Sequence, residues 1–125
     1  MEWFEALPEQ CPPENAFEPN NELFYRIVRS ENIEFSDFIS QREADNTKVF
    51  TGISECTART LSVFNNLDAT KKLLKLPKFR NKKIAEIILS KEDGLLLKTF
   101  TNPYHYSWWR AKSYDISRAK LYRNE

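Results

Sequence analysis

The sequence lacks any long hydrophobic run. No apolar stretch in the 125 residues approaches the roughly 20 residues that a helix needs to cross a bilayer. Residues 1–5 also have neither the basic start nor the apolar stretch of a signal peptide. We therefore expect a cytoplasmic protein with no membrane partner.

Glycine is scarce as well, with only two residues, whereas 41% of the chain is apolar and 14% is aromatic. Segments stay disordered when they are too polar to bury a core, so this composition excludes disorder for most of the length. A chain of 125 residues can bury enough surface for one independent core. We therefore do not expect a second domain.

Cysteine and histidine are too few for a metal site. Cys11 and Cys56 are far apart with no CxxC spacing, and His105 is the only histidine. A zinc site takes several such ligands at short spacings, so the sequence predicts no metal. Disulfides are rare in cytoplasmic proteins, and we expect both cysteines to be reduced, with Cys56 a small buried thiol rather than a nucleophile.

Two segments each lack charge of one sign, although the formal net charge is only +1. Residues 1–22 contain six glutamates and no Lys or Arg, and four prolines make a regular element there improbable. We interpret residues 1–22 as an arm and residues 23–125 as a single domain. The arm should lie on the domain surface, held by its large apolar side chains Trp3, Phe4, Leu7 and Phe17.

The opposite bias occurs between Lys71 and Lys83. Residues 69–85 contain seven Lys or Arg and no acid. Such a run is more often a solvated face than a binding site, so nucleic acid is a possible partner here but not the favoured one. The acidic arm could also lie beside this run and offset its charge.

Short runs rich in β-branched and aromatic residues predict strands at 23–28, 60–64, 83–90 and 95–101. Asn65 or Asn66 is a good cap for a helix over 67–76, which Pro77 should end. A short helix or turn is expected within 33–41, with Ser36 as its cap, and a loop over 42–47. The tail, 114–122, is ambiguous between strand and helix.

The Asp93-Gly94 pair lies between two predicted strands and favours a type I′ turn. The sequence therefore predicts a β-hairpin that joins 83–90 to 95–101 and delivers residues 104–109 to one edge of the sheet. The expected fold class is α+β, with a small mixed, mainly antiparallel sheet and a few short helices.

Two places in the sequence suggest a site. Arg26 lies among aromatic residues on a predicted strand, where a guanidinium must reach solvent or find partners, of which Asp37 is one candidate. His105 lies in an aromatic segment, 104–109, that could stack a nicotinamide or adenine ring. The same rings could equally pack in the hydrophobic core at a corner of the sheet.

Three motifs occur in a suggestive order: Phe24-Tyr25-Arg26, then Leu61-Ser62-Val63-Phe64 leading into a helix, then His105-Tyr106-Ser107 after a late strand. This order resembles the ADP-ribosyltransferase-like toxins of type VI secretion, over roughly residues 23–109. More broadly it is similar to the ADP-ribosyltransferase superfamily, in which a first-strand Arg or His and a later Ser-containing strand line the NAD cleft.

The resemblance implies an ADP-ribosyltransferase-like fold and an NAD-dependent transferase, such as a bacterial toxin that modifies a protein target and is held by an immunity protein. It implies that Arg26 contacts a phosphate or ribose of NAD, for which a guanidinium fork is suited. Ser62 would hold the nicotinamide ribose, and His105 would complete the catalytic set. The side chains expected to bind NAD beside Arg26 and Ser62 are Tyr25, Tyr106 and Trp108.

The chain departs from the resemblance in one respect. Typical members carry a catalytic glutamate on a late strand, but from Gly94 onward this sequence has only Asp115 and Glu125 as acids. A transfer that works without the glutamate and a fold kept for binding alone therefore both stay open. A non-enzymatic interaction module and an RNA-binding protein that uses residues 71–83 are the further alternatives.

Overall fold

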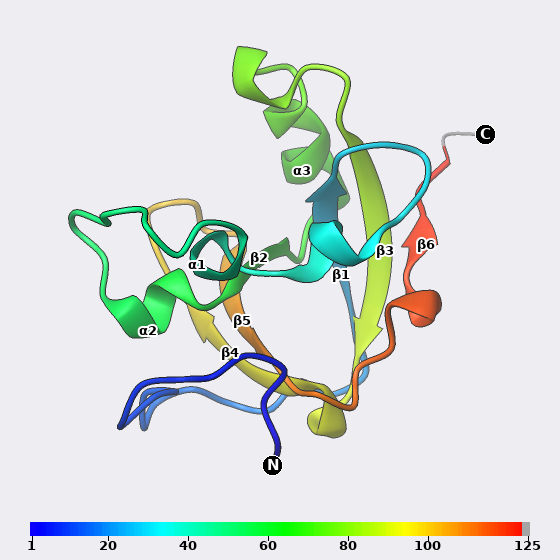
Figure 1. The fold of residues 1–125 in the computed structure, drawn as a ribbon. Helices are drawn as coiled ribbons and strands as arrows, with labels where there is room; N and C mark the ends of the chain where they lie inside the picture. Colours follow the sequence, from blue (N-terminus) through cyan, green and yellow to red (C-terminus); the bar gives the residue numbers. More distant parts are fainter. Residues whose placement is uncertain (124–125) are drawn as a thin grey trace.

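A six-stranded, fully antiparallel sheet forms the centre of the structure, a computed structural model that describes residues 1–123 (Figure 1). Its strand order is β4-β5-β2-β1-β3-β6. The strands are β1 (Glu22–Val28), β2 (Leu61–Phe64), β3 (Lys83–Leu89), β4 (Gly94–Lys98), β5 (His105–Arg110) and β6 (Lys120–Leu121). The fold is thus a small mixed α+β protein, as the sequence predicted.

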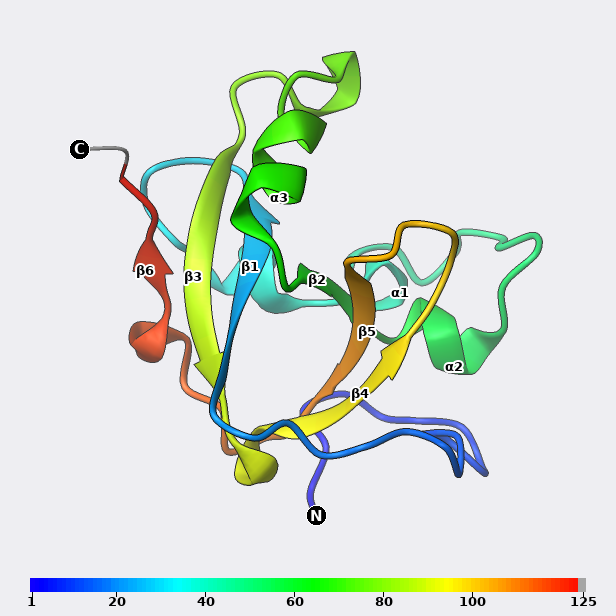
Figure 2. The ribbon, with the colours of Figure 1, turned by 180° about the vertical axis from the view of Figure 1, so that it is seen from behind.

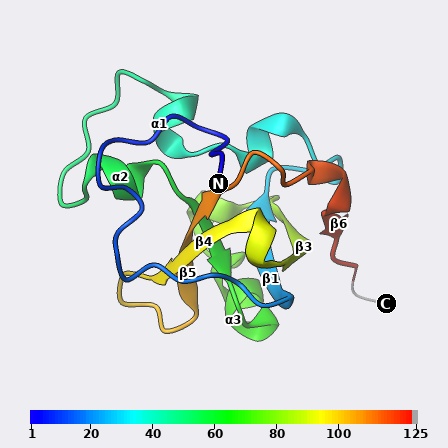
Figure 3. The same ribbon diagram turned by 90° about the horizontal axis from the view of Figure 1, so that it is seen from below.

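Short helices fill the connections. The α-helices are α1 (Gln41–Ala44), α2 (Glu55–Ala58) and α3 (Leu67–Leu73), and the 3₁₀ turns are η1 (Phe35–Phe38), η2 (Pro77–Phe79), η3 (Lys91–Asp93) and η4 (Ile116–Arg118). Seen from below, β4 runs at a steep angle to β1 and β3, so the sheet is strongly curved (Figure 3). No helix within residues 1–123 has both the length and the apolar character needed to cross a bilayer.

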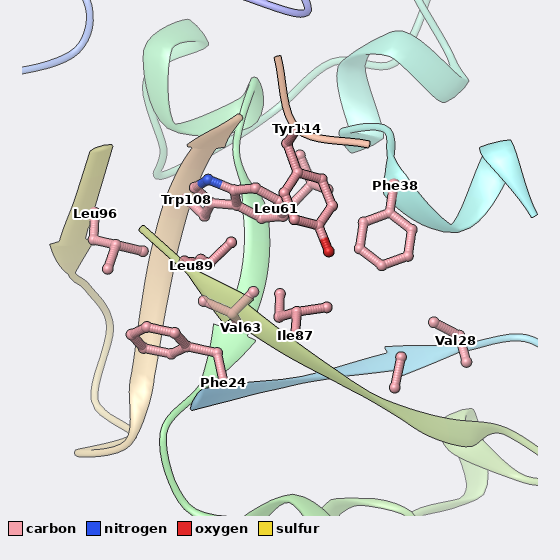
Figure 4. Close-up of a cluster of buried hydrophobic side chains, with 11 residues drawn as sticks. Phe24, Val28, Phe38, Leu61, Val63, Ile87, Leu89, Leu96, Trp108 and Tyr114 are labelled. Carbon is pink, nitrogen blue, oxygen red and sulfur yellow. The ribbon is translucent and has the colours of Figure 1, made fainter. Parts of the chain in front are cut away.

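The core lies on the concave side of this curved sheet (Figure 4). Alternate residues of each strand face it, because successive side chains of a strand point to opposite faces. The largest side chains of this cluster are Trp108 and Tyr114, whose rings meet edge to face at 5.1 Å. The other buried members that Figure 4 labels are Phe24, Val28, Phe38, Leu61, Val63, Ile87, Leu89 and Leu96.

Most elements lie close to their predicted positions. The strands at 23–28, 60–64 and 83–90 are confirmed, and Asn66 caps α3 by accepting from the backbone N–H of Ala69 at 2.9 Å. Helix α3 ends three residues early, because the next residues wind as a 3₁₀ turn before Pro77. Glu34, not Ser36, caps η1, and residues 42–47, expected to be a loop, begin inside α1.

The predicted hairpin at Asp93-Gly94 is wrong. Strand β3 pairs with β1 and β6, whereas β4 pairs only with β5, at the other edge of the sheet. Asp93 accepts a hydrogen bond from the backbone N–H of Ser90 at 2.7 Å, which closes the 3₁₀ turn η3 instead of a type I′ turn. The chain therefore turns a corner here, from one end of the sheet to the other.

Gly94 is required at this corner. Its φ is +134°, and a Cβ at this position would overlap the carbonyl oxygen of Trp109. The actual hairpin is β4–β5, closed by residues 99–104. The aromatic segment therefore becomes β5, an interior strand between β4 and β2, rather than an exposed edge.

The acidic arm packs along one end of the sheet, as expected from its apolar residues. Trp3 bridges to Ala111, and Phe17 exchanges backbone hydrogen bonds with Leu96 on the free edge of β4. The ring of Phe17 nevertheless stays 43% exposed. Covering β4 in this way leaves less of its edge free to pair with another chain.

Both cysteines are joined in a disulfide, so the prediction of free thiols is wrong. Cys11 of the arm is bonded to Cys56 of α2, with 5.6 Å between their Cα atoms. A separation of 45 positions gives no local signal, because only the folded arm brings the two residues together. Cytoplasmic proteins rarely keep such bonds, so this one does not favour the cytoplasmic location expected from the sequence.

Candidate functional site

The sheet opens between its two central strands. Strand β1 pairs with β3 along its whole length, from Glu22 opposite Leu89 to Val28 opposite Lys83. With β2 it forms a single registered pair, Tyr25 opposite Phe64. Beyond this pair, the two strands have carbonyl groups without strand partners, and side chains must satisfy them.

Arg26 occupies this opening. Its Nη1 donates to the carbonyl oxygen of Ser62 at 2.8 Å, and its Nε donates to the carbonyl oxygen of Asp37 at 2.7 Å. The expected partner Asp37 is therefore engaged through its backbone, because its carboxylate accepts from the N–H groups of Arg29 and Glu34. The guanidinium thus replaces strand pairing and ties β1 to β2.

Burial lowers the pKa of Arg26 to about 10, partly offset by the nearby acids. The guanidinium therefore keeps its charge at neutral pH. It also lies over the ring of Phe38, 5.7 Å from the centroid. A positive charge is thus held in a fixed position where the two strands part.

Ser62 and His105 form the second part of the site. The His105 Nε2 lies 2.8 Å from the Ser62 Oγ, and its Nδ1 lies 3.2 Å from the carbonyl oxygen of Thr99. A carbonyl oxygen only accepts, so we assign the ring proton to Nδ1. Nε2 is then free to accept the proton of the exposed Ser62 hydroxyl.

Burial also lowers the pKa of His105, against a smaller opposing effect from its hydrogen bond to the Thr99 backbone. The imidazole is therefore neutral at pH 7, since the ordinary value is already about 6.5. The rings of Phe64 and Phe100 lie 5.3 and 5.1 Å from it. The site thus holds an oriented, neutral base against a polarised hydroxyl.

A pocket of about 520 Å³ contains all three residues, Arg26, Ser62 and His105. One wall is α2 with the loop before it, and the opposite wall comes from the end of α3 and from η2. Phe100 closes the rim, with its side chain 61% exposed and its backbone at φ +64°. A bulky residue rarely adopts this conformation, which often marks a functional loop.

The pocket is cationic. Arg26, Arg29, Lys78 and Lys82 line it, and no Asp or Glu does within the described residues. Asp115, one of the two late acids, caps η4 away from the pocket by accepting from the backbone N–H of Ser117. Glu125 lies outside the described residues. The chemistry of the lining therefore favours an anionic ligand.

The structure separates the other predicted ligand-binding residues from the pocket. Tyr106 and Trp108 alternate with His105 along β5, so their rings turn to the core face, where Tyr106 packs on Phe24 at 5.7 Å. The Trp108 indole donates instead to the carbonyl oxygen of Asp93 at 2.9 Å. Neither ring is placed to stack a ligand.

Tyr25 is also outside the pocket lining. It lies where β1 faces β3, opposite Glu86. Burial raises the pKa of its phenol, and the charges of Glu86 and Tyr122 add to the effect. Tyr25 also pairs with Phe64 of β2, so it lies in the fully paired part of the sheet.

Comparisons with protein families, with characterised proteins and with solved structures find no match to this chain. Its function must therefore be argued from the pocket itself. Within residues 1–123, no group of three or more His, Cys, Asp or Glu side chains is placed to hold a metal ion.

Sequence reasoning missed Thr99 and Phe100. Thr99 orients His105 through its carbonyl and its hydroxyl, and the same hydroxyl lies 2.7 Å from the Ser107 Oγ. One available signal was the position of both residues at the end of the predicted strand 95–101, just before the Asn102-Pro103 breaker. Residues on loops between strands commonly carry function.

Proposed function

We propose that this protein is an ADP-ribosyltransferase-like enzyme that binds NAD in the pocket at the opening between β1 and β2. The observation that carries the proposal is the convergence of Arg26, Ser62 and His105, from three different strands, on one pocket. The resemblance expects an Arg on the first strand and a Ser on a later strand to line one cleft. Here those two strands are neighbours in the sheet.

The chemistry of the pocket suits NAD. Its volume of about 520 Å³ falls in the range of small-molecule and cofactor sites. Arg26 supplies a fixed positive charge for a diphosphate, and Ser62 supplies an exposed hydroxyl for a ribose. The lining lacks the catalytic glutamate of typical relatives, so this site would have to work without it.

When bound, NAD supplies a ribosyl carbon whose bond to nicotinamide breaks, with the electron pair leaving on the nicotinamide nitrogen as the lone pair of an acceptor forms the new bond. His105 takes the acceptor's proton at Nε2, directly or through the Ser62 hydroxyl. Arg26 holds the anionic part of the substrate. Phe100 and Phe64 keep water from the imidazole.

Titration calorimetry with NAD tests the binding. We expect the wild type to bind and Ser62→Ala to lose at least about tenfold in affinity, since one hydrogen bond to a ligand is worth roughly 1.4 kcal/mol. Ser113→Ala is the matched control, because Ser113 is exposed outside the pocket and bonds to the carbonyl oxygen of Glu92. No binding by the wild type at millimolar NAD would overturn the proposal.

Release of nicotinamide tests the chemistry separately. His105→Gln should abolish release while the affinity for NAD changes little, because the glutamine amide is polar but not basic. Binding without release in the wild type would instead identify a binding module that uses the same pocket, which the missing carboxylate favours. If the enzyme is a toxin, its expression should arrest growth and Arg26→Ala should relieve the arrest.

A further inference from the structure

The basic run extends over α3, η2 and the loop that follows, at the top of Figures 1 and 2, and ends at the first residue of β3. We name this surface the basic face; its residues are Lys71, Lys72, Lys75, Lys78, Arg80, Lys82 and Lys83. Most of these side chains are exposed, with Lys71 and Lys82 half-buried. In the described part of the chain, none of them is ion-paired with a carboxylate.

The acidic arm does not offset this charge, contrary to the possibility raised by the sequence. Figures 1 and 2 both place the arm at the end of the molecule opposite α3 and η2. Glu5 of the arm pairs with Arg59, and Glu2 pairs with Lys112. The basic face therefore keeps its positive potential.

The basic face continues into the pocket. Lys78 and Lys82 belong to both, and Phe79 between them lines the pocket wall. Phe100, which is largely exposed, lines the same pocket. Unpaired cations thus lead directly to flat aromatic surfaces, which suits a polymer that carries both phosphates and accessible rings.

Single-stranded nucleic acid has this chemistry. Proteins that bind it combine a cationic path for the backbone with aromatic side chains that stack the bases. A duplex keeps its bases stacked inside, so they cannot reach Phe79 and Phe100. An anionic membrane would meet the lysines but would leave the pocket unused.

We propose that the basic face binds single-stranded nucleic acid and guides one nucleotide of it into the pocket. The backbone lies along Lys72 and Lys75, and an entering base stacks on Phe100. In the transfer described above, this nucleotide is the acceptor, and that part of the proposal rests on the proposed function. Its binding to the basic face does not depend on NAD.

Fluorescence anisotropy with a labelled twelve-nucleotide single strand tests this binding. We compare the wild type with Lys72→Gln/Lys75→Gln and with the matched control Lys91→Gln/Lys112→Gln. Both variants lose two positive charges, but Lys91 and Lys112 lie outside the basic face, on η3 and after β5. Lys72 and Lys75 do not line the pocket, so NAD affinity should stay unchanged in both variants.

Each phosphate contact on a single strand contributes a slope of about 0.7 to the dependence of log affinity on log salt. The basic-face variant should therefore lose about 1.4 from this slope and bind roughly 25-fold more weakly at 0.1 M salt. The control should bind within about twofold of the wild type. Phe100→Ala should lower the affinity for the single strand about fivefold or more and leave the salt slope unchanged.

The other outcomes separate the two proposals. NAD binding without nucleic-acid binding overturns the basic-face proposal and leaves the proposed function standing. Nucleic-acid binding without NAD binding overturns the proposed function and leaves the basic-face proposal standing. Equal binding of single strand and duplex, equal losses in both double variants, or binding only to vesicles that contain phosphatidylserine would each overturn the basic-face proposal.

Discussion

Strand β1 meets its two neighbours in opposite ways. Toward β3 the ladder is complete from Glu22 to Val28, and the buried side chains of both strands share the core. Toward β2 the ladder is reduced to one pair, and the Arg26 guanidinium bonds across the opening. Toward β3, backbone hydrogen bonds pair the two strands, and β1 contributes to the fold. Toward β2, a side chain supplies the missing hydrogen bonds, and β1 contributes to the candidate site.

The two sides of β1 should also differ in how their residues affect stability and ligand binding. On the closed side of β1, toward β3, a residue of β3 should affect stability alone, because no residue of β3 lines the pocket. A residue at the opening should affect stability and ligand binding together. Four experiments test this division, beginning with the largest expected effect.

Ile87→Ala changes the closed side. Ile87 lies on β3, only 1% exposed within the core, and truncating such a residue usually costs about 2–5 kcal/mol of the free energy of unfolding. Urea unfolding should show this loss, while titration calorimetry shows unchanged affinity for the pocket ligand. An altered affinity in the folded variant would mean that the two sides of β1 are coupled.

Arg26→Ala changes the opening. The carbonyl oxygens of Ser62 and Asp37 lose their donor, which should cost about 1–3 kcal/mol of unfolding free energy. Binding of an anionic ligand should disappear as well. Arg26→Lys keeps the charge but not the planar fork, so it should recover part of the ligand affinity and less of the stability. A folded Ala variant with wild-type affinity would contradict this role.

The pH dependence of the free energy of unfolding tests the environment of His105, the single histidine of the site. Because burial lowers the pKa of His105 in the folded protein, the unfolded chain binds the proton more readily below about pH 6.5. The free energy of unfolding should therefore fall as the pH drops from 6.5 through the folded-state pKa, by at most about 1.4 kcal/mol per pH unit. The decline should be absent in His105→Gln, measured by urea unfolding at each pH.

A contribution from carboxylates should appear only at lower pH. Burial by itself would raise the pKa of Asp93, but hydrogen bonds from Arg118 and Ser90 lower it. Its stabilisation is therefore complete above about pH 4 and is lost as the pH falls through the folded-state value. This window does not overlap that of His105. A decline above pH 5 that persists in His105→Gln would contradict the assignment.

Tyr114→Phe should have the smallest effect. The Tyr114 hydroxyl is buried and has no hydrogen-bond partner among the described residues, and burial raises the pKa of the phenol to about 12. Removing a buried hydroxyl that bonds to nothing should be neutral or stabilise the fold by up to about 1 kcal/mol. Thermal unfolding measures the change. A clear destabilisation would show that the hydroxyl has a partner.

Local patterns predicted much of the sheet. Runs rich in β-branched and aromatic residues located β1, β2 and β3, and Asn66 marked the start of α3. The same patterns misled at Asp93-Gly94, where a good turn pair was used for a corner rather than a hairpin. Turn chemistry reports the local backbone, but it does not report which strands will pair.

The candidate site was predicted in its main residues and missed in its surroundings. Arg26 and His105 stood out because a strand arginine and a lone histidine are chemically conspicuous, and Ser62 was expected from the resemblance. Thr99 and Phe100 did not, since their roles depend on the loop that places them against the imidazole. Tyr106 and Trp108 were expected in the site, but strand alternation turned them to the core.

By itself, the sequence determined strands β1, β2 and β3, the start of α3 and the residues with reactive side chains, because these follow from neighbours a few positions apart. Only the tertiary structure decided the Cys11–Cys56 bond, the opening between β1 and β2, and the meeting of Ser62 with His105, 43 positions away. Such long-range pairings depend on how the whole sheet curves and packs. No short segment of the chain contains that information.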